Sequence, residues 1–237
     1  MRSKPRAFLS AHWKHLVMAN YVVEAELLVP FLPKGTELDT YADKHYISLV
    51  AFSFLQTKVR GISFPFHRNF VEVNLRFYVR RKTEDGYRRG VVFIKEIVPR
   101  ALISFVANVL YNENYTTMKT FGEITRNDGT LQLHYQFGRY NHMEVLCSDT
   151  AVPIQNGSME AFITEHYWGY AGDPESRTNA YQVEHPKWDI LPVQEYLVTC
   201  DFEKVYGSPF AHLQFVEPES VLTAVGSDVL VYSGNKI

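Results

Sequence analysis

The chain has 237 residues, 46% of them hydrophobic and 14% aromatic, with a formal net charge of −2. This length and composition suffice for one sizeable core, so we expect a single domain over residues 1–237. The near-neutral charge, without a long run of one sign, argues against nucleic-acid binding. No apolar run reaches transmembrane length and the N-terminus lacks a signal-peptide core, so we expect a soluble cytoplasmic protein that engages no membrane.

Motifs for common cofactors and metals are absent from the sequence. Cys147 and Cys200 lack metal-type spacing and form no disulfide framework, which agrees with a reducing compartment. His12 and His15 do not belong to a His-Glu-x-x-His pattern. There is also no dinucleotide fingerprint, Walker loop or Gly-x-Ser-x-Gly elbow. We therefore predict no cofactor and no metal site.

Taken in order, the first half of the chain predicts an amphipathic segment, a helix, a buried strand and a two-stranded hairpin. Residues 7–19 suit a strand or a helix, and residues 21–29 predict a helix that ends before the prolines at 30 and 33. Residues 45–55 predict a buried strand. Residues 70–79 and 91–98 predict two strands joined through Asp85-Gly86, the strongest short-range hairpin signal.

The second half predicts mostly strands. After Pro99, residues 101–110 have the apolar pattern of a buried helix. Asp128-Gly129 predicts another hairpin between 120–125 and 131–137. Further predicted elements are strands at 143–148, 162–170 and 229–233, a returning segment at 179–188, and a short helix at 192–197. The fold class expected is α+β, mainly antiparallel β.

The strand at 70–79 is unusual because both of its faces are informative. Its alternation places valine, leucine and phenylalanine side chains on one face. The other face carries Phe70, Glu72, Asn74, Arg76 and Tyr78. Glu72 and Arg76 are separated by roughly 13 Å along a strand, so each needs a partner on a neighbouring strand.

The second hairpin strand offers partners that depend on register. If paired residue numbers sum to 172, Arg76 faces Glu96 and Glu72 faces Arg100; if they sum to 171, Arg76 faces Lys95. Charge matching favours the first register, which would gather Glu72, Asn74, Arg76, Glu96 and Arg100. Such a cluster is either a structural salt-bridge network or the polar floor of a pocket.

Four short segments in order resemble one family: Phe70 to Val79, Gly90 to Phe93, Ile163 to Tyr167, and Val183 to Trp188. They are similar to the Glu-x-Asn-x-Arg-x-Tyr-Val, aromatic-strand, Glu-x-Tyr and His-Pro-x-Trp segments of the YqjF-like family of uncharacterised bacterial proteins. The similarity spans nearly the full chain. That family is grouped with acetoacetate-decarboxylase-like proteins, which implies a closed or nearly closed antiparallel β-barrel with flanking helices and an internal pocket.

The resemblance also implies a departure from the decarboxylase. The superfamily's enzyme uses a Schiff-base lysine next to a second lysine. Aligning the comparable stretch, residues 95–101, places Arg100 where the nucleophile would stand, and arginine forms no imine. Lys95 is the only nearby lysine. Glu72 matches the superfamily's pocket glutamate.

The leading hypothesis is a pocket protein that binds or acts on a small carboxylate or a keto or enol compound. Arg76 and Arg100 would hold a carboxylate or enolate oxygen, and Glu72 would be the general acid or base. The predicted ligand-binding wall contains Asn74, Tyr78, Glu96, Glu165, Tyr167 and His185. Three alternatives stay open: a noncatalytic ligand sensor, a scaffold whose polar cluster only fixes the fold, and Schiff-base chemistry at Lys95. Assembly as a homo-oligomer is also left open.

Overall fold

The computed structural model describes residues 7–64, 68–99 and 114–237. The helix predicted at 101–110 and the candidate Arg100 lie outside these ranges. The strands are β1 Leu9–Val23, β2 Glu37–Leu38, β3 His45–Val59, β4 Phe70–Thr83, β5 Gly86–Val98, β6 Tyr115–Thr117, β7 Thr120–Asn127, β8 Thr130–Phe137, β9 Asn141–Ser148, β10 Val152–Pro153, β11 Trp168–Ala171, β12 Asn179–Glu184, β13 Asp189–Leu191, β14 Val193–Thr199, β15 Ser220–Val231 and β16 Asn235–Lys236. The helices are α1 Ala25–Leu28, η1 Val29–Phe31, α3 Met159–Thr164, α4 Phe202–Tyr206 and η2 Ser208–Phe215.

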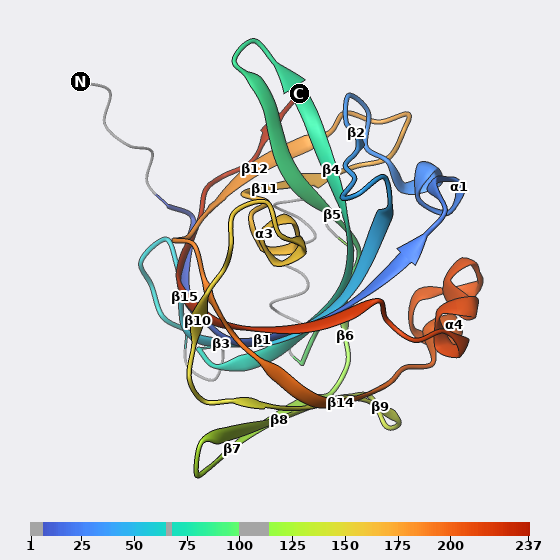
Figure 1. Cartoon of the computed structure of the whole chain (residues 1–237). Coiled ribbons are helices and arrows are strands. Elements are labelled where there is room, and N and C mark those ends of the chain that lie inside the picture. The colour runs from blue at the N-terminus through green and yellow to red at the C-terminus, as the bar shows by residue number, and fades with distance from the viewer. Residues whose placement is uncertain (1–6, 65–67, 100–113) are drawn as a thin grey trace.

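The main sheet is mostly antiparallel and its pairings lead back to their start. The order runs β15, β1, β3, β4, β5, β11, β12, and β12 pairs again with β15 through Val183 and Val231. Only β5 with β11 and β5 with β6 pair in parallel among the described strands. Figure 1 shows these strands as a ring around α3. No helix in the described ranges combines the length and apolarity needed to cross a membrane.

The long central strands are buried on both faces. The face of β4 that carries Val73, Leu75, Phe77 and Val79 packs against a second sheet, of order β14-β9-β8-β7. Leu133 and Tyr135 of β8 belong to the same core. The opposite face looks into the ring, where a second cluster gathers around Phe52, Phe54, Tyr78, Phe162 and Trp188. The polar face of β4 is therefore enclosed, because apolar layers cover the sheet on either side.

Helix α3 lies within the ring opening in the view of Figure 1. The hydroxyl of Ser158 caps its N-terminus by accepting a hydrogen bond from the Ala161 amide at 3.3 Å. The ring of Phe162 packs on Tyr46 and Tyr78, with ring centroids 6.0 and 5.1 Å away. Alternation at 162–170 predicts a strand, and that prediction is wrong up to residue 167, because the cap and the Phe162 contacts favour a helical turn.

Two further predicted helices differ from the structure: the first is a strand at its start, and the second is a strand. The helix expected over 21–29 begins only at Ala25, because Tyr21 and Val23 still pair with Ile47 and His45 across β1 and β3. The helix expected over 192–197 is strand β14, which completes the second sheet by pairing with β9. In contrast, residues 7–19, left open between helix and strand, belong to β1 apart from their first two.

The β4–β5 hairpin forms as expected, but its register differs. Thr83 pairs with Gly86 across the turn. From this pair to the pair of Arg76 with Phe93, the two residue numbers of each pair sum to 169. A register shift between Leu75 and Arg76 then changes the pairing, so that Asn74 faces Glu96 and Arg76 faces Phe93. The predicted pairing of Arg76 with Glu96 is wrong, as is the alternative with Lys95. The β-bulge at Ile94 nevertheless keeps Glu96 on the same face as Asn74.

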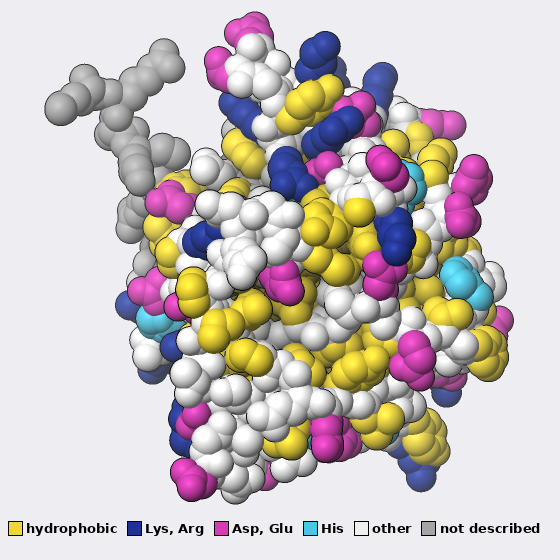
Figure 2. Space-filling model, viewed as in Figure 1, with side chains coloured by type: hydrophobic (Ala, Val, Ile, Leu, Met, Phe, Trp, Pro, Cys, Tyr) yellow, Lys and Arg dark blue, Asp and Glu magenta, His cyan; other side chains and the backbone are white. Residues whose placement is uncertain are grey.

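The charged hairpin tip stands clear of the rest of the molecule. Figure 2 shows Lys and Arg side chains gathered at the top of the view, where the β4–β5 hairpin projects in Figure 1. Two arginines of the β4–β5 hairpin have acidic partners on or next to β2: Arg80 pairs with Glu37 at 2.8 Å and Arg89 with Asp39 at 2.6 Å.

Candidate functional site

A cavity of about 290 Å³ lies inside the ring of strands. Much of its wall is aromatic, with the rings of Phe8, Trp13, Phe52, Phe54, Phe70 and Trp188. Its polar side chains include Glu72, Asn74, Arg76, Glu96, Tyr115, His166 and His185. A mostly apolar hollow with a few convergent polar groups is the usual form of a small-molecule site.

The acidic part of the wall centres on Glu72, which is only 3% exposed. The amide of Asn74 donates to Oε1 of Glu72 at 3.0 Å, and the Tyr115 hydroxyl donates to Oε2 at 3.5 Å. Burial raises the pKa of Glu72 to about 7, although these two hydrogen bonds and the charge of Arg76 act against the rise. Burial, together with the charges of Glu72 and Glu96, also raises the pKa of Tyr115 well above its ordinary value. Glu72 is thus suited to exchange a proton near neutral pH.

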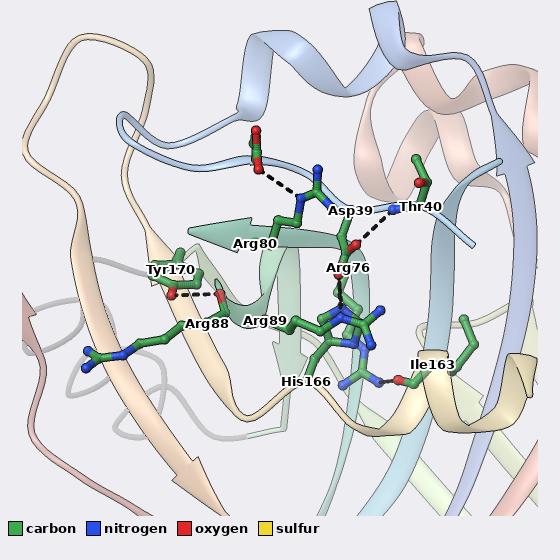
Figure 3. Close-up of polar contacts among 10 residues, drawn as sticks. Asp39, Thr40, Arg76, Arg80, Arg88, Arg89, Ile163, His166 and Tyr170 are labelled. Carbon is green, nitrogen blue, oxygen red and sulfur yellow. Dashed lines mark hydrogen bonds and ion pairs between the residues drawn. The ribbon is translucent and has the colours of Figure 1, made fainter. Parts of the chain in front are cut away.

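Arg76 is 9% exposed, and it is the only arginine or lysine among the described residues that line the cavity. Its Nη2 donates to the carbonyl of Ile163 at 3.3 Å (Figure 3). The same nitrogen lies 3.7 Å from the sulfur of Met18. Within the described ranges, no carboxylate lies within 4.0 Å of its guanidinium, and its buried Nε has no hydrogen-bond partner. A buried charge without a counter-ion is costly, so this guanidinium is available to an anion.

A second polar group lies beside Arg76. Nε2 of His166 is 3.2 Å from Oδ2 of Asp39, and Nε of Arg89 donates to the same oxygen at 2.6 Å (Figure 3). The Thr40 amide donates to Oδ1 at 3.0 Å. Burial alone would raise the pKa of Asp39, but the hydrogen bonds from His166 and Arg89 lower it to about 2. Burial lowers the pKa of His166 to about 4, against the effect of Asp39, so this imidazole is neutral at neutral pH.

The structure brings some predicted site residues together and separates others. Glu72, Asn74, Arg76, Glu96 and His185 line the cavity. The His185 ring stacks on Trp188 at 4.1 Å, and burial lowers its pKa to about 4. Tyr78 is core: its hydroxyl is 2.7 Å from Ser48 Oγ.

Three other predicted residues are not among the described residues that line the cavity. Glu165 pairs with Lys187 at 2.8 Å, and Tyr167 packs behind the cavity wall, against the lining residue His185, with ring centroids 4.8 Å apart. Lys95 lies on the opposite face of β5, where its amino group donates to the carbonyl of Val205 in α4 and sits 6.0 Å from the Tyr206 ring. Strand alternation separates it from Glu96, its neighbour in sequence.

Sequence reasoning missed His166, Asp39 and Tyr115. Treating 162–170 as a strand favoured Glu165 and Tyr167 over His166, because alternation assigns neighbours to opposite faces. The Glu-His-Tyr segment follows a helix instead, and its middle residue enters the cavity. No group of histidine, cysteine and acidic side chains suited to a metal occurs in the part of the chain that the structure describes.

A known protein family matches most of the chain. The model of the DUF2071 family, described as "Uncharacterized conserved protein (COG2071)", matches residues 10–228. The chain belongs to this family. This DUF2071 chain is also 33% identical over 75 residues to "Uncharacterized protein YqjF" of Bacillus subtilis (strain 168). That match covers 31% of the chain and 31% of YqjF, so the chain spans about a third of the length of this curated relative. The expected membership of the YqjF-like family is confirmed.

Solved structures share the fold of this DUF2071 chain. The enduracididine biosynthesis enzyme MppR complexed with pyruvate has a TM-score of 0.68 at 14% identity, over 99% of the chain and 91% of MppR. Acetoacetate decarboxylase from Legionella pneumophila has a TM-score of 0.65 at 11% identity, over 100% of the chain and 90% of the enzyme. An acetoacetate-decarboxylase-like enzyme from Sphingomonas wittichii RW1 gives 0.65 at 9% identity, over 99% and 94%. The acetoacetate-decarboxylase-like fold, mostly antiparallel β, is confirmed; identities this low carry no function across.

Proposed function

We propose that the chain binds a small carboxylate, or a keto or enol compound, in the cavity inside the ring and acts on it without a Schiff-base lysine. The observation that carries this proposal is the guanidinium of Arg76, which is buried on the cavity wall with a backbone carbonyl and a sulfur as its polar contacts. A ligand carboxylate would supply the missing counter-charge. We take the returning ring of strands to be a closed barrel that keeps this site from bulk water.

The lysine content supports chemistry other than imine formation. No lysine occurs among the described residues that line the cavity. Residues 65–67 and 100–113 contain no lysine in the sequence, so Lys4 is the only one outside the described ranges. Lys95 is engaged with α4 on the outer face. Arg100, the other proposed oxygen-binding residue, lies outside the described ranges.

Glu72 is the proton-transfer group of the proposal. Its pKa of about 7 lets it both give and take a proton under neutral conditions. The chemistry would be proton transfer at a carbon next to a carbonyl, with Arg76 holding the carboxylate. Support also comes from the shared fold, since MppR is described in complex with pyruvate and with a condensation product of pyruvate.

Isothermal titration calorimetry tests the binding site. We expect 3-phenylpropanoate to bind and its carboxamide to bind much more weakly, because only the acid offers a negative charge to Arg76. Arg76→Met should abolish acid binding. Arg80→Met is the matched control, because Arg80 lies on the same strand but pairs with Glu37 outside the cavity. Equal binding of the acid to Arg76→Met and wild type would contradict the proposal.

Two of the open alternatives are separated by simple measurements. Pyruvate in deuterated water should exchange its methyl hydrogens faster with the protein than with Glu72→Gln; binding without exchange would favour a noncatalytic sensor. If the polar cluster were only a scaffold, Arg76→Met would cost about 3–5 kcal/mol of unfolding free energy. We instead expect it to be neutral or stabilising, because methionine removes a buried charge that has no carboxylate within 4.0 Å among the described residues.

A further inference from the structure

Several buried polar atoms on the cavity wall have no hydrogen-bond partner within the described ranges, among them atoms of Trp13, Thr57, Asn74, Arg76 and His166. Two of them lie on neighbouring side chains: Nε of Arg76, which can only donate, and Nδ1 of His166. The side chain of His166 is 1% exposed, and both residues line the cavity. Figure 3 shows the two side chains close together below Arg89, and the positive charge of Arg76 acts on His166. Native structures rarely leave such atoms unsatisfied, so the pair points to a ligand.

The surroundings of Asp39 decide which nitrogen of His166 carries the hydrogen. Asp39 is 5% exposed, and Arg89 and Thr40 both donate to its carboxylate. These contacts stabilise the ionised form, which accepts hydrogen bonds only. Nε2 of His166 must therefore donate to Oδ2. Since burial and two nearby arginines disfavour the imidazolium, Nδ1 is left with a lone pair, and it is an unpartnered acceptor on a side chain that lines the cavity.

We infer that the ligand carries a hydroxyl on the carbon next to its carboxylate, with the hydroxyl donating to Nδ1 of His166 and the carboxylate accepting from Nε of Arg76. This inference rests on the proposed carboxylate site and narrows its ligand class. A 2-hydroxy acid has this arrangement, and so does the enol form of a 2-oxo acid. The keto form does not, because its carbonyl oxygen would oppose the His166 lone pair.

Phenyl compounds make suitable probes because much of the wall is aromatic. The rings of Trp13, Phe54 and Trp188 line the same cavity. In calorimetry, wild type should bind one enantiomer of 3-phenyllactate roughly tenfold more tightly than 3-phenylpropanoate, the expected effect of satisfying one buried acceptor. Phenylpyruvate tests the enol form of a 2-oxo acid as the other source of this hydroxyl. The ultraviolet absorbance of the enol shows whether the protein binds that form.

His166→Phe removes the acceptor while Asp39 keeps its contacts with Arg89 and Thr40. In this variant the preference for 3-phenyllactate should fall to about one. His134→Phe is the matched control, because His134 lies on β8 of the second sheet, outside the described cavity lining. It should retain the tenfold preference.

Nitrogen-15 NMR of the full-length protein gives a test that needs neither a ligand nor a variant. His166 should show a hydrogen on Nε2 and none on Nδ1; the reverse tautomer would overturn the inference. Equal binding of the two acids to wild type, or a preference that survives in His166→Phe, would overturn it while leaving the Arg76 site intact. Failure of every acid to bind would overturn the proposed function and this inference together.

Discussion

Nε2 of His166 lies 3.2 Å from Oδ2 of Asp39, and both side chains are buried. Through Arg89 on β5, the same carboxylate links the segment after α3 to the β4–β5 hairpin. The contacts among Asp39, Arg89 and His166 therefore both hold α3 over the cavity and orient the imidazole. Its energy depends on pH, because the pKa values of both Asp39 and His166 are shifted.

The first prediction concerns His166 and acid stability. Its folded-state pKa, about 4, lies below the ordinary value of 6.5, so the unfolded chain binds the proton more tightly. The stability that His166 contributes is complete above pH 6.5 and is lost as the pH falls toward 4. His166→Phe should therefore lose less unfolding free energy than wild type between pH 7 and 5, by about 2 kcal/mol.

Urea unfolding at the two pH values measures this difference. His185 also has a pKa lowered to about 4, but it is present in both proteins and cancels in the comparison. Parallel pH profiles for the two proteins would show that His166 is solvated or protonated in the folded state.

The second prediction concerns Glu72 and has the opposite sign. Its folded-state pKa of about 7 lies above the ordinary 4.5, so its contribution is complete below pH 4.5 and lost as the pH rises through 7. Glu72→Gln keeps an acceptor for Asn74 and Tyr115 but never ionises. The variant should gain roughly 2 kcal/mol relative to wild type between pH 5 and pH 8. Denaturant titrations at both pH values check it, and a difference that does not change with pH would contradict the raised pKa.

The third prediction uses Gly169, which lines the cavity on β11. A Cβ there would overlap the Tyr181 ring, so Gly169→Ala should push that ring and reduce the cavity. Overpacking of this kind costs about 1–3 kcal/mol of unfolding free energy. We expect 3-phenylpropanoate binding to weaken more than binding of a two- or three-carbon acid, as measured by calorimetry.

Gly122→Ala is the control for that experiment. Its Cβ would press on Tyr135 and Val71 at 2.8 Å, and Gly122 lies outside the described cavity lining. Similar destabilisation without a change in ligand size preference is expected. If both variants altered binding alike, general loosening of the fold would explain the effect instead of a smaller cavity.

The fourth prediction concerns Lys95. Since its amino group is bound to Val205 on the outer face, borohydride with pyruvate should leave Lys95 unmodified in wild type. Peptide mass spectrometry reads the result directly. A reduced adduct on Lys95 would restore imine chemistry and would require β5 to present its other face to the ligand.

Residue patterns alone were enough to predict the hairpin of β4 and β5, the family, and the shared face of Glu72, Asn74 and Arg76. A strand alternates with a period of two, so residues at even spacing must lie together wherever the strand is placed. The charged and aromatic composition of that face also indicated either a salt-bridge network or the floor of a pocket. These are local properties, and they do not depend on what packs above the strand.

The other residues of the site come together only through the packing of distant segments. The β-bulge at Ile94 sets Glu96 opposite Asn74, and alternation cannot reveal one inserted residue. His166 meets Asp39 across 127 residues because the turn after α3 directs it inward, a geometry set by the Phe162 contacts. Burial then makes the pKa values of Glu72 and His166 what they are, since desolvation is a property of the enclosed cavity and not of either side chain.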